Sequence, residues 1–360
     1  MNRALNFNAG PSALPEAVLK EAEKNWLDFN GTGMAIMELS HRSKEYQAVH
    51  DKAISLLKKL LSIPDDYEVL FIQGGASLQF SMVPMNLLSK SQTAQYVLSG
   101  SWSEKALKEA NKIGKTFIAA SSKDQKYRFI PEHNEDCDLE NAAYLHITSN
   151  NTIYGTQWHS FPSNKKTPLI ADMSSDILSR PLDMSNFDLI YAGAQKNLGP
   201  SGVTVVIIRK ELLEKSSEEL PSMLNYNTYA KNNSLYNTPP TLAIYLLTLV
   251  LEWADKEGGL EQIEKMNEEK AKILYDVIDE SDGFYLGHAL KGSRSRMNVT
   301  FNLHNEEASK DFLHQAKEAG FVGLGGHRSI GGCRASIYNA VPAEHVQKLA
   351  EFMKAFKNRN

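Results

Sequence analysis

The chain has 360 residues, of which 42% are hydrophobic and 23% charged, a composition typical of a globular protein with about two domains. Its formal net charge of -4 gives no electrostatic attraction to nucleic acid or to an anionic membrane, so neither is expected as a partner. The two cysteines, Cys137 and Cys333, show no metal-ligand spacing, and the N-terminus lacks the apolar segment of a secretion signal. We therefore expect a cytoplasmic protein without a metal site.

Strand-like and helix-like segments alternate through the first two-thirds of the chain. Short apolar runs predict strands at residues 68–73, 94–100, 116–121, 142–148, 167–175, 187–193 and 203–209. Because these runs are continuously apolar rather than alternating, both faces of the sheet should be covered. The pattern predicts an α/β fold with a mostly parallel sheet and helices on both sides.

Three segments predict helices that matter for this fold. Residues 78–90 and 101–115 each follow a predicted strand, and the second has a serine at its expected N-cap. Residues 242–253 are almost wholly apolar and follow Pro239-Pro240, which predicts a buried helix started by proline. This apolar stretch is too short to span a bilayer.

The composition changes near Gly258-Gly259. The following run, residues 257–281, is charged and helix-prone, and short strands are predicted among helices further on. These features indicate a smaller α+β domain. The expected division is a large domain at 16–257 and a small C-terminal domain at 258–360, joined by the N-terminal segment 1–15.

Polar clusters follow the carboxyl ends of the predicted strands, which is the edge where open α/β sheets bind ligands. The GGAS segment (74–77) separates a strand from a helix, where free backbone amides favour an anion. Trp102 follows the next strand, and Thr152 lies in the polar segment TSNNTIYGT after another. Taken singly, these are a turn, a core tryptophan and a second turn; together they indicate a ligand site.

Asp172 and Lys196 carry the chemical signal. A carboxylate after the apolar strand of Asp172 needs a partner, which is either a backbone cap, an arginine such as Arg180, or a cationic ring nitrogen. Lys196, in IYAGAQKNLGPSG, is either a surface charge or, if desolvated, a nucleophile. A Schiff-base lysine, an acid for a pyridinium nitrogen, an anion site and a stacking ring are what pyridoxal phosphate requires.

Two further stretches predict sites for anionic groups. ELSHRSKEY carries His41 and Arg42, and GLGGHRSIGGCRASIYN carries His327, Arg328 and Arg334. Arginine binds carboxylate or phosphate through two parallel hydrogen bonds, although basic surface loops explain either stretch taken alone. Cys333 has no evident base partner, which argues against a cysteine nucleophile.

The chain resembles the phosphoserine aminotransferase family of class-V, pyridoxal-phosphate-dependent enzymes over almost its whole length. The resemblance is carried by NFNAGPSALP, GTGMAIMELSHRS, FIQGGASLQF, TSNNTIYGTQW, ADMSSDILSRPLD, YAGAQKNLGPSG, YNTPPT and HRSIGGCRASIYNA. It implies the aspartate-aminotransferase-like fold. It also implies amino transfer from L-glutamate to 3-phosphohydroxypyruvate, which gives O-phosphoserine and 2-oxoglutarate in serine biosynthesis.

The resemblance implies roles for the cofactor-site residues. Lys196 would hold the cofactor covalently and move the substrate proton, and Asp172 would keep the ring nitrogen protonated. Trp102 would stack on the ring, and Thr152 would bond near its hydroxyl group. The remaining residues would bind the cofactor phosphate: the amides of Ala76 and Ser77, the Gln195 side chain, and Asn237 and Thr238 of a neighbouring subunit.

The resemblance also implies the substrate contacts. Arg334 would bind the α-carboxylate. His327 and Arg328, with His41 and Arg42 of the other subunit, would bind the substrate phosphate or the distal carboxylate of glutamate. A homodimer with shared active sites follows from these roles.

Two alternatives remain at this point. One is a different pyridoxal-phosphate enzyme on the same fold, such as a cysteine desulfurase, which needs a reactive cysteine. The other is a non-catalytic phosphate-binding protein that uses GGAS as its anion site and leaves Lys196 unexplained. Ser77 stands where some relatives have an arginine, so the substrate phosphate should depend more on the histidine and arginine residues.

Overall fold

The structure is a computed structural model that describes residues 3–133, 140–162, 166–217, 219–328 and 330–359. The helices are α1 (Glu16–Lys24), α2 (Lys44–Leu60), α3 (Gln79–Leu87), α4 (Ser101–Ala110), α5 (Lys210–Glu214), α6 (Tyr226–Lys231), α7 (Thr241–Lys256), α8 (Gly259–Asp279), α9 (Glu306–Glu318) and α10 (Ala343–Arg359). The strands are β1 (Leu5–Asn6), β2 (Tyr67–Gln73), β3 (Thr93–Leu98), β4 (Lys115–Ser121), β5 (Ala142–Thr148), β6 (Asn150–Asn151), β7 (Thr156–Gln157), β8 (Leu169–Asp172), β9 (Leu189–Gly193), β10 (Val203–Arg209), β11 (Tyr285–Gly287), β12 (Asn298–Leu303), β13 (Phe321–Val322) and β14 (Cys333–Ser336).

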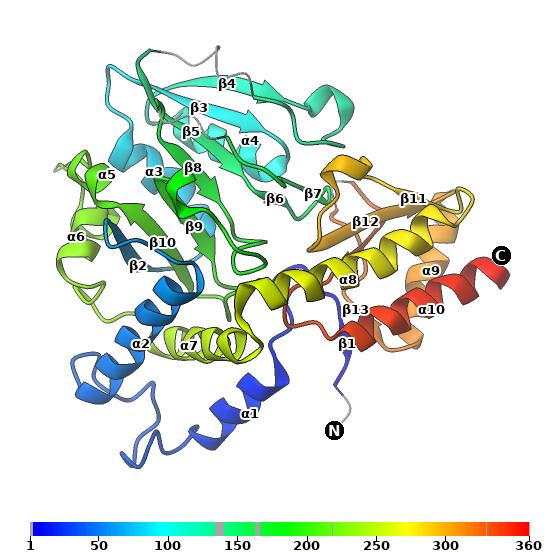
Figure 1. Cartoon of the computed structure of the whole chain (residues 1–360), viewed down its shortest axis with the longest axis horizontal. Helices are drawn as coiled ribbons and strands as arrows, with labels where there is room; N and C mark the ends of the chain where they lie inside the picture. The colour runs from blue at the N-terminus through cyan, green and yellow to red at the C-terminus, as the bar shows by residue number, and fades with distance from the viewer. Residues whose placement is uncertain (1–2, 134–139, 163–165, 218, 329, 360) are drawn as a thin grey trace.

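The main sheet has seven strands in the order β2-β10-β9-β8-β5-β3-β4 (Figure 1). The strands from β9 to β4 are parallel to one another, whereas β10 is antiparallel to both β2 and β9. The predicted mostly parallel α/β sheet is therefore confirmed. Because β10 runs in the opposite direction, Val203 pairs with Gln73, and Thr204 pairs with Gly193. The start of β10 thus lies at the same edge as the carboxyl ends of its neighbours.

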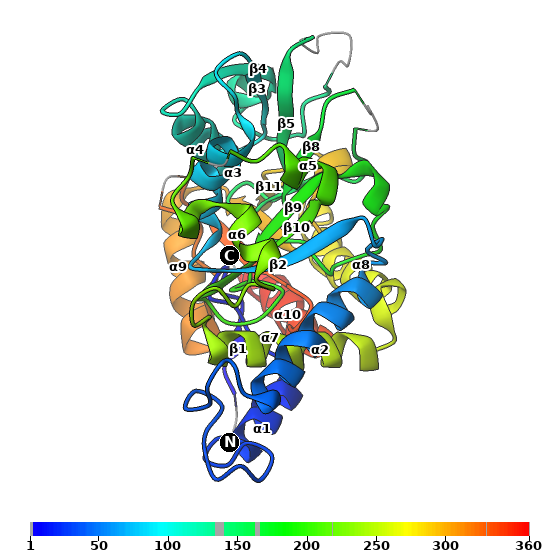
Figure 2. The ribbon, with the colours of Figure 1, turned by 90° about the vertical axis from the view of Figure 1, so that its left-hand side faces the viewer.

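Helices cover both faces of this sheet, as the continuous apolar strands predicted. The apolar residues of α2, α7 and the start of α8 pack on one face, and α2 and α7 lie side by side (Figures 1 and 2). Apolar residues of α3, α4, α5 and α6 pack on the other. The predicted buried helix at 242–253 lies within α7, and no helix among the described residues is long and apolar enough to cross a membrane.

One helix cap differs from the prediction. Helix α4 begins at Ser101, but its N-cap is Gly100 rather than a serine. The hydroxyl of Ser103 accepts hydrogen bonds from the backbone N–H groups of Ser99 and Gly100. The Ser103 side chain, in the first turn of α4, thus pairs the amides of Ser99 and Gly100, which the side chain of a serine N-cap would not reach.

A second core forms around the antiparallel sheet β11-β12-β14, covered by α8, α9 and α10 (Figure 1). The N-terminal segment joins this core, since β1 pairs in parallel with β13 and Phe7 is fully buried there. Gly258 is the N-cap of α8 and Gly259 is its first residue, and both have a positive φ, which glycine adopts without steric cost. The domain boundary at 257/258 stays a prediction.

A buried lysine fixes the loop that follows β14. Lys270, 1% exposed, donates from Nζ to the carbonyl oxygens of Ile337 (3.0 Å), Tyr338 (2.7 Å) and Val341 (3.1 Å). The contacts connect α8 to this loop, and three acceptors offset part of the desolvation of the amine.

Replacement of Lys270 by methionine should lower the free energy of unfolding by about 3 kcal/mol, because three buried carbonyl groups lose their donor. Urea denaturation followed by circular dichroism measures this difference. Lys272→Met, on the same helix, is the control: its side chain is 73% exposed and pairs with Asp276, so it should change stability by less than about 1 kcal/mol. Equal losses in the two variants would contradict a structural role for the carbonyl contacts.

Candidate active site

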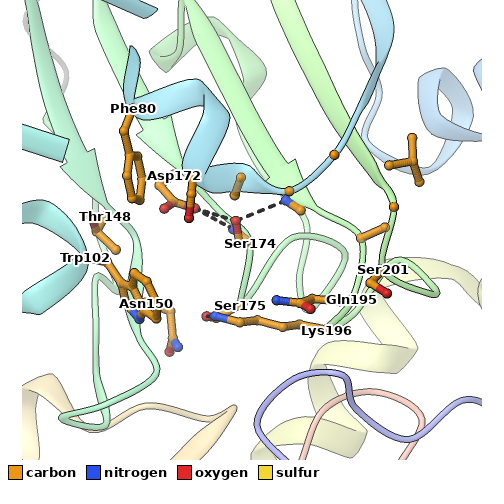
Figure 3. A pocket seen from close by; sticks show the side chains of 18 residues that line it. Phe80, Trp102, Thr148, Asn150, Asp172, Ser174, Ser175, Gln195, Lys196 and Ser201 are labelled. Carbon is orange, nitrogen blue, oxygen red and sulfur yellow. Dashed lines mark hydrogen bonds between the residues drawn. The ribbon is translucent and has the colours of Figure 1, made fainter. Parts of the chain in front are cut away.

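A cavity of about 240 Å³ lies where the carboxyl ends of β2, β5, β8 and β9 meet the start of β10. Side chains at or just after several of these strand ends, among them Thr148, Asp172 and Lys196, line it (Figure 3). Six of the residues predicted from the sequence line it: Ala76, Ser77, Trp102, Asp172, Gln195 and Lys196. The sheet edge chosen from the sequence is therefore the edge that holds a cavity.

Lys196 extends across this cavity (Figure 3). Its Nζ donates to the hydroxyl oxygens of Thr152 (2.6 Å) and Ser175 (2.7 Å), which are themselves 2.7 Å apart. The side chain is half-buried, and burial lowers the pKa of its amine to about 8, against the weaker opposing effect of Asp172. The amine is thus partly neutral near pH 8, the form that acts as nucleophile or base.

The backbone around Lys196 is fixed by two distant parts of the chain. Ser12 donates from its amide to the carbonyl of Gln195 (2.9 Å) and from its hydroxyl to the carbonyl of Lys196 (2.5 Å). From the other side, the Asn339 amide donates to Oδ1 of Asn197 (3.1 Å). Sequence reasoning assigned no role to Ser12, because a serine near the N-terminus carries no local signal for contact with residue 196.

Asp172 ends β8 and is only 6% exposed. Its Oδ1 accepts from the amide of Ser174 (3.0 Å) and from the Ser174 hydroxyl (2.6 Å). Burial raises the pKa of Asp172, whereas both Ser174 hydrogen bonds and the charge of Lys196 lower it. The alternative prediction that Arg180 pairs with Asp172 was wrong, because the Arg180 guanidinium donates to the carbonyls of Trp158 and His159 instead.

Trp102 and Thr148 contribute unpaired polar atoms to the cavity wall. The Trp102 ring centroid lies 5.8 Å from Nζ of Lys196, and its buried Nε1 has no hydrogen-bond partner among the described residues. Thr148 pairs with Asp172 in the sheet register, and its buried hydroxyl likewise lacks a partner in the described structure. Sequence reasoning missed Thr148; the available signal was its position as the polar last residue of an otherwise apolar strand.

The predicted anion site is a turn between β2 and the short 3-10 helix η1 (Ala76–Leu78), which continues directly into α3. Gly74 has a φ of +95°. A Cβ atom added at Gly74 or Gly75 would have no neighbour within 4 Å, so the space beside this turn is open. The first amides of a helix have no partner within it. Gly193 allows β9 to approach, since a Cβ there would lie 3.2 Å from the Ala76 nitrogen. The antiparallel β10 adds Ser201 and Gly202 to the lining, which a parallel strand would not.

A group of cations lies next to the lysine. Arg334, on β14, donates from Nη1 to the carbonyl of Thr152 (3.3 Å), and its buried Nε has no hydrogen-bond partner among the described residues. The pKa of His327 is lowered by burial and by the positive charges of Arg334, Lys105 and Arg328. Lys105, which the sequence analysis did not select, places Nζ 4.2 Å from the Trp102 ring centroid. This concentration of positive charge suits an anionic ligand.

The other predicted residues form a separate patch outside the cavity. Nδ1 of His41 lies 3.2 Å from the hydroxyl of Thr238, and Asn237 donates to the Gln73 side chain (3.0 Å). Arg42 is exposed, and its guanidinium makes no ion pair or hydrogen bond with the described residues. Within one chain, His41 contacts Thr238 and Asn237 contacts Gln73, and none of the four residues lines the cavity that holds Lys196.

Cys333 is not a nucleophile. It is 2% exposed within β14, and burial raises the pKa of its thiol to about 12. A thiol must be ionised to react, so this environment makes it inert. Cys137 lies outside the described residues.

The chain is similar to known proteins over its full length. A sequence profile of the aminotransferase class-V family matches residues 4–349. The phosphoserine aminotransferase of Geobacillus kaustophilus (strain HTA426) is 65% identical over 359 residues, covering 100% of this chain and 99% of that protein.

Two solved structures extend the comparison. One is a structure of a phosphoserine aminotransferase that describes radiation damage of its Schiff base. It is 63% identical to this chain, with a TM-score of 0.98, and the match covers 100% of both chains. A phosphoserine aminotransferase from Trichomonas vaginalis with bound PLP has a TM-score of 0.92 and 36% identity, covering 98% of this chain and 100% of that one.

The lowered pKa of Lys196 can be measured directly. Competitive labelling of the ligand-free protein with acetic anhydride should give an acetylation rate that rises with pH around a midpoint of about 8. The exposed Lys310 should instead be acetylated with a midpoint at higher pH, because its hydrogen bond to Glu306 raises its pKa. Mass spectrometry of the two peptides gives both profiles, and coincident profiles would contradict the desolvation of Lys196.

Proposed function

The chain belongs to the aminotransferase class-V family, and from this premise we propose that it transfers the amino group of L-glutamate to 3-phosphohydroxypyruvate with pyridoxal phosphate as cofactor. The products are 2-oxoglutarate and O-phosphoserine, in serine biosynthesis. The observation that carries this proposal is the half-buried Lys196 amine, whose pKa is lowered to about 8, in one cavity with the buried carboxylate of Asp172.

The donor set of the cavity fits this cofactor. Lys196 would hold it covalently through Nζ, and Asp172 would accept a hydrogen bond from its ring nitrogen. Trp102 would cover a ring face, and Thr152 would bond near the ring hydroxyl. The unpaired Thr148 hydroxyl in the cavity wall supports the presence of a polar ligand.

The phosphate of the cofactor would be bound at the glycine turn. The free amides of Ala76 and Ser77 and the Gln195 side chain offer donors without requiring a cation. Asn237 and Thr238 would add donors from a second subunit.

The main catalytic role proposed for the chain itself is proton transfer by Nζ of Lys196. Bound pyridoxal phosphate supplies a ring that stabilises the negative charge left on a substrate carbon. Nζ of Lys196 would take the proton from Cα of glutamate and, in the second half of the transfer, would deliver a proton to Cα of the product amino acid. Thr152 and Ser175 hold this amine by hydrogen bonds of 2.6 and 2.7 Å, so it stays within the cavity between the two proton transfers.

The cations provide binding and selectivity. Arg334 would bind the α-carboxylate that all substrates share, and its unpaired Nε supports that role. His327 and Arg328, together with His41 and Arg42 from a second subunit, would bind the distal carboxylate of glutamate or the phosphate of the acceptor. Several cations suit substrates that carry two or more negative charges.

We also propose a homodimer with shared sites, a proposal that the separation of these residues supports. Within one chain, His41 and Thr238 contact each other outside the cavity, and Arg42 is exposed without a partner among the described residues. A second copy related by a two-fold axis would bring both patches to the opposite cavities. The proposed compartment is the cytoplasm.

Neither alternative has support in the molecule. A cysteine desulfurase needs a reactive thiol, and the Cys333 thiol is buried with a pKa raised to about 12. A phosphate-binding protein without catalysis would not require a half-buried Lys196 in one cavity with the buried Asp172.

The proposed chemistry is tested by the absorption spectrum of the purified protein. A visible band should bleach when glutamate is added and return with 3-phosphohydroxypyruvate but not with pyruvate. Lys196→Ala should lose the covalent link to the cofactor and the half-reaction, a loss of at least about 10³-fold in rate, because the proton has no carrier. A protein that remains colourless with added pyridoxal phosphate would overturn the proposal.

Shared sites are tested by co-expression of two inactive variants. In a mixed dimer of Lys196→Ala and Arg42→Ala chains, one of the two sites holds both native residues. Because random assembly makes about half of the dimers mixed, about one quarter of the native activity should return in the whole mixture. The control pairs Lys196→Ala with Arg334→Ala; since both residues serve the same chain's site, no mixed site is native and no activity should return. Equal recovery in the two mixtures would contradict sharing.

A further inference from the structure

The carboxylate of Asp172 is held asymmetrically. Both hydrogen bonds to it come from Ser174, through the amide (3.0 Å) and the hydroxyl (2.6 Å), and both reach Oδ1 (Figure 3). No hydrogen bond from the described residues reaches Oδ2. Because Asp172 lines the cavity, one oxygen is fixed by the protein and the other is available to a ligand.

Ser174 is itself fixed by the neighbouring strand. Its hydroxyl oxygen accepts from the amide of Gly193 (3.1 Å), the last residue of β9. The hydroxyl proton is therefore directed to Asp172, since its oxygen is already used as an acceptor. Gly193 lies three residues before Lys196, so the strand that precedes the lysine turn also orients the donor to the carboxylate.

The ionisable groups near Asp172 have opposite effects on the ionisation of its carboxylate. Lys196 favours the ionised form. Burial, and more weakly the charge of Asp172, raises the pKa of Asp176, so the two carboxylates repel each other. Tyr191, whose pKa burial raises, adds no positive charge. Apart from the distant effect of Lys196, Ser174 is the group that offsets the desolvation of this carboxylate.

We infer that Ser174 is a positioning residue that keeps the negative charge on Asp172, so that a proton shared with the cofactor's ring nitrogen stays on the nitrogen. This rests on the cofactor of the proposed function. Hydrogen-bond donors reduce the proton affinity of a carboxylate, and a shared proton resides on the stronger base. A protonated ring is the better electron acceptor, so Ser174 controls the strength of that acceptor through Asp172.

The chain contains the same local motif in a second environment. Asp183, Met184 and Ser185 repeat the Asp-Met-Ser sequence, and Oδ1 of Asp183 accepts from the Ser185 amide (3.0 Å) and hydroxyl (2.7 Å). This copy is exposed and caps the 3-10 helix η4 (Met184–Asn186). The two motifs share their local geometry and differ in burial and in contact with a cavity, which makes Ser185 a matched control.

The test is nitrogen-15 NMR of the full-length holoenzyme reconstituted with pyridoxal phosphate labelled at the ring nitrogen. Wild type, Ser174→Thr and Ser185→Ala should give the resonance of a protonated ring. Ser174→Ala should move it toward the unprotonated resonance, for which Asp172→Asn serves as reference. The dissociation constant of the cofactor should rise about tenfold in Ser174→Ala, as expected for one lost hydrogen bond to a charged group.

Three outcomes would overturn the inference. An unchanged resonance in Ser174→Ala removes the effect on the proton, whatever happens to affinity or activity. An equal shift in Ser185→Ala shows that the change is not specific to the cavity. Wild-type protein that binds no labelled cofactor overturns the proposed function and this inference together, whereas the first two outcomes overturn the inference alone.

Discussion

Desolvation at one edge of the main sheet is the constraint on which the site depends. Burial lowers the pKa of Lys196 to about 8 and raises that of Asp172, so both groups are moved toward their neutral forms. Hydroxyl groups, rather than a direct ion pair, stabilise the two side chains. Thr152 and Ser175 accept hydrogen bonds from the amine of Lys196, and Ser174 donates one to the carboxylate of Asp172. Each charge therefore remains available to a ligand, which a closed Lys–Asp pair would prevent.

This arrangement requires parts of the chain that are far apart in sequence. The turn after β9 is bonded by Ser12 near the N-terminus and by Asn339 near the C-terminus. Lys270 fixes the loop of Asn339 by its three carbonyl contacts. The smaller sheet and its helices thus do more than add stability, since they set the backbone position from which Lys196 reaches the cavity.

The cations are distributed in two groups with different distances from the lysine. Arg334 is linked to Lys196 through Thr152, since Arg334 donates to the Thr152 carbonyl and Lys196 donates to the Thr152 hydroxyl. His41 and Arg42 do not line the cavity of their own chain, and His41 contacts Thr238 instead. In the proposed dimer, the group common to all substrates is bound within the chain, and the group that distinguishes them is bound partly across the interface. Assembly and selectivity would then be coupled.

Much of the site was predictable because parallel strands bring their carboxyl ends to one edge. Apolar runs predicted the strands, and residues that follow them, such as Asp172 and Lys196, had to meet there. The sequence alone therefore determined the sheet, its ligand edge and the chemistry of the family. Only the tertiary structure decided the direction of β10, the hydrogen bond between Gly193 and Ser174, and the contact of Ser12 with the lysine turn. Those depend on how distant segments approach one another, and periodicity and residue type describe only what is local along the chain.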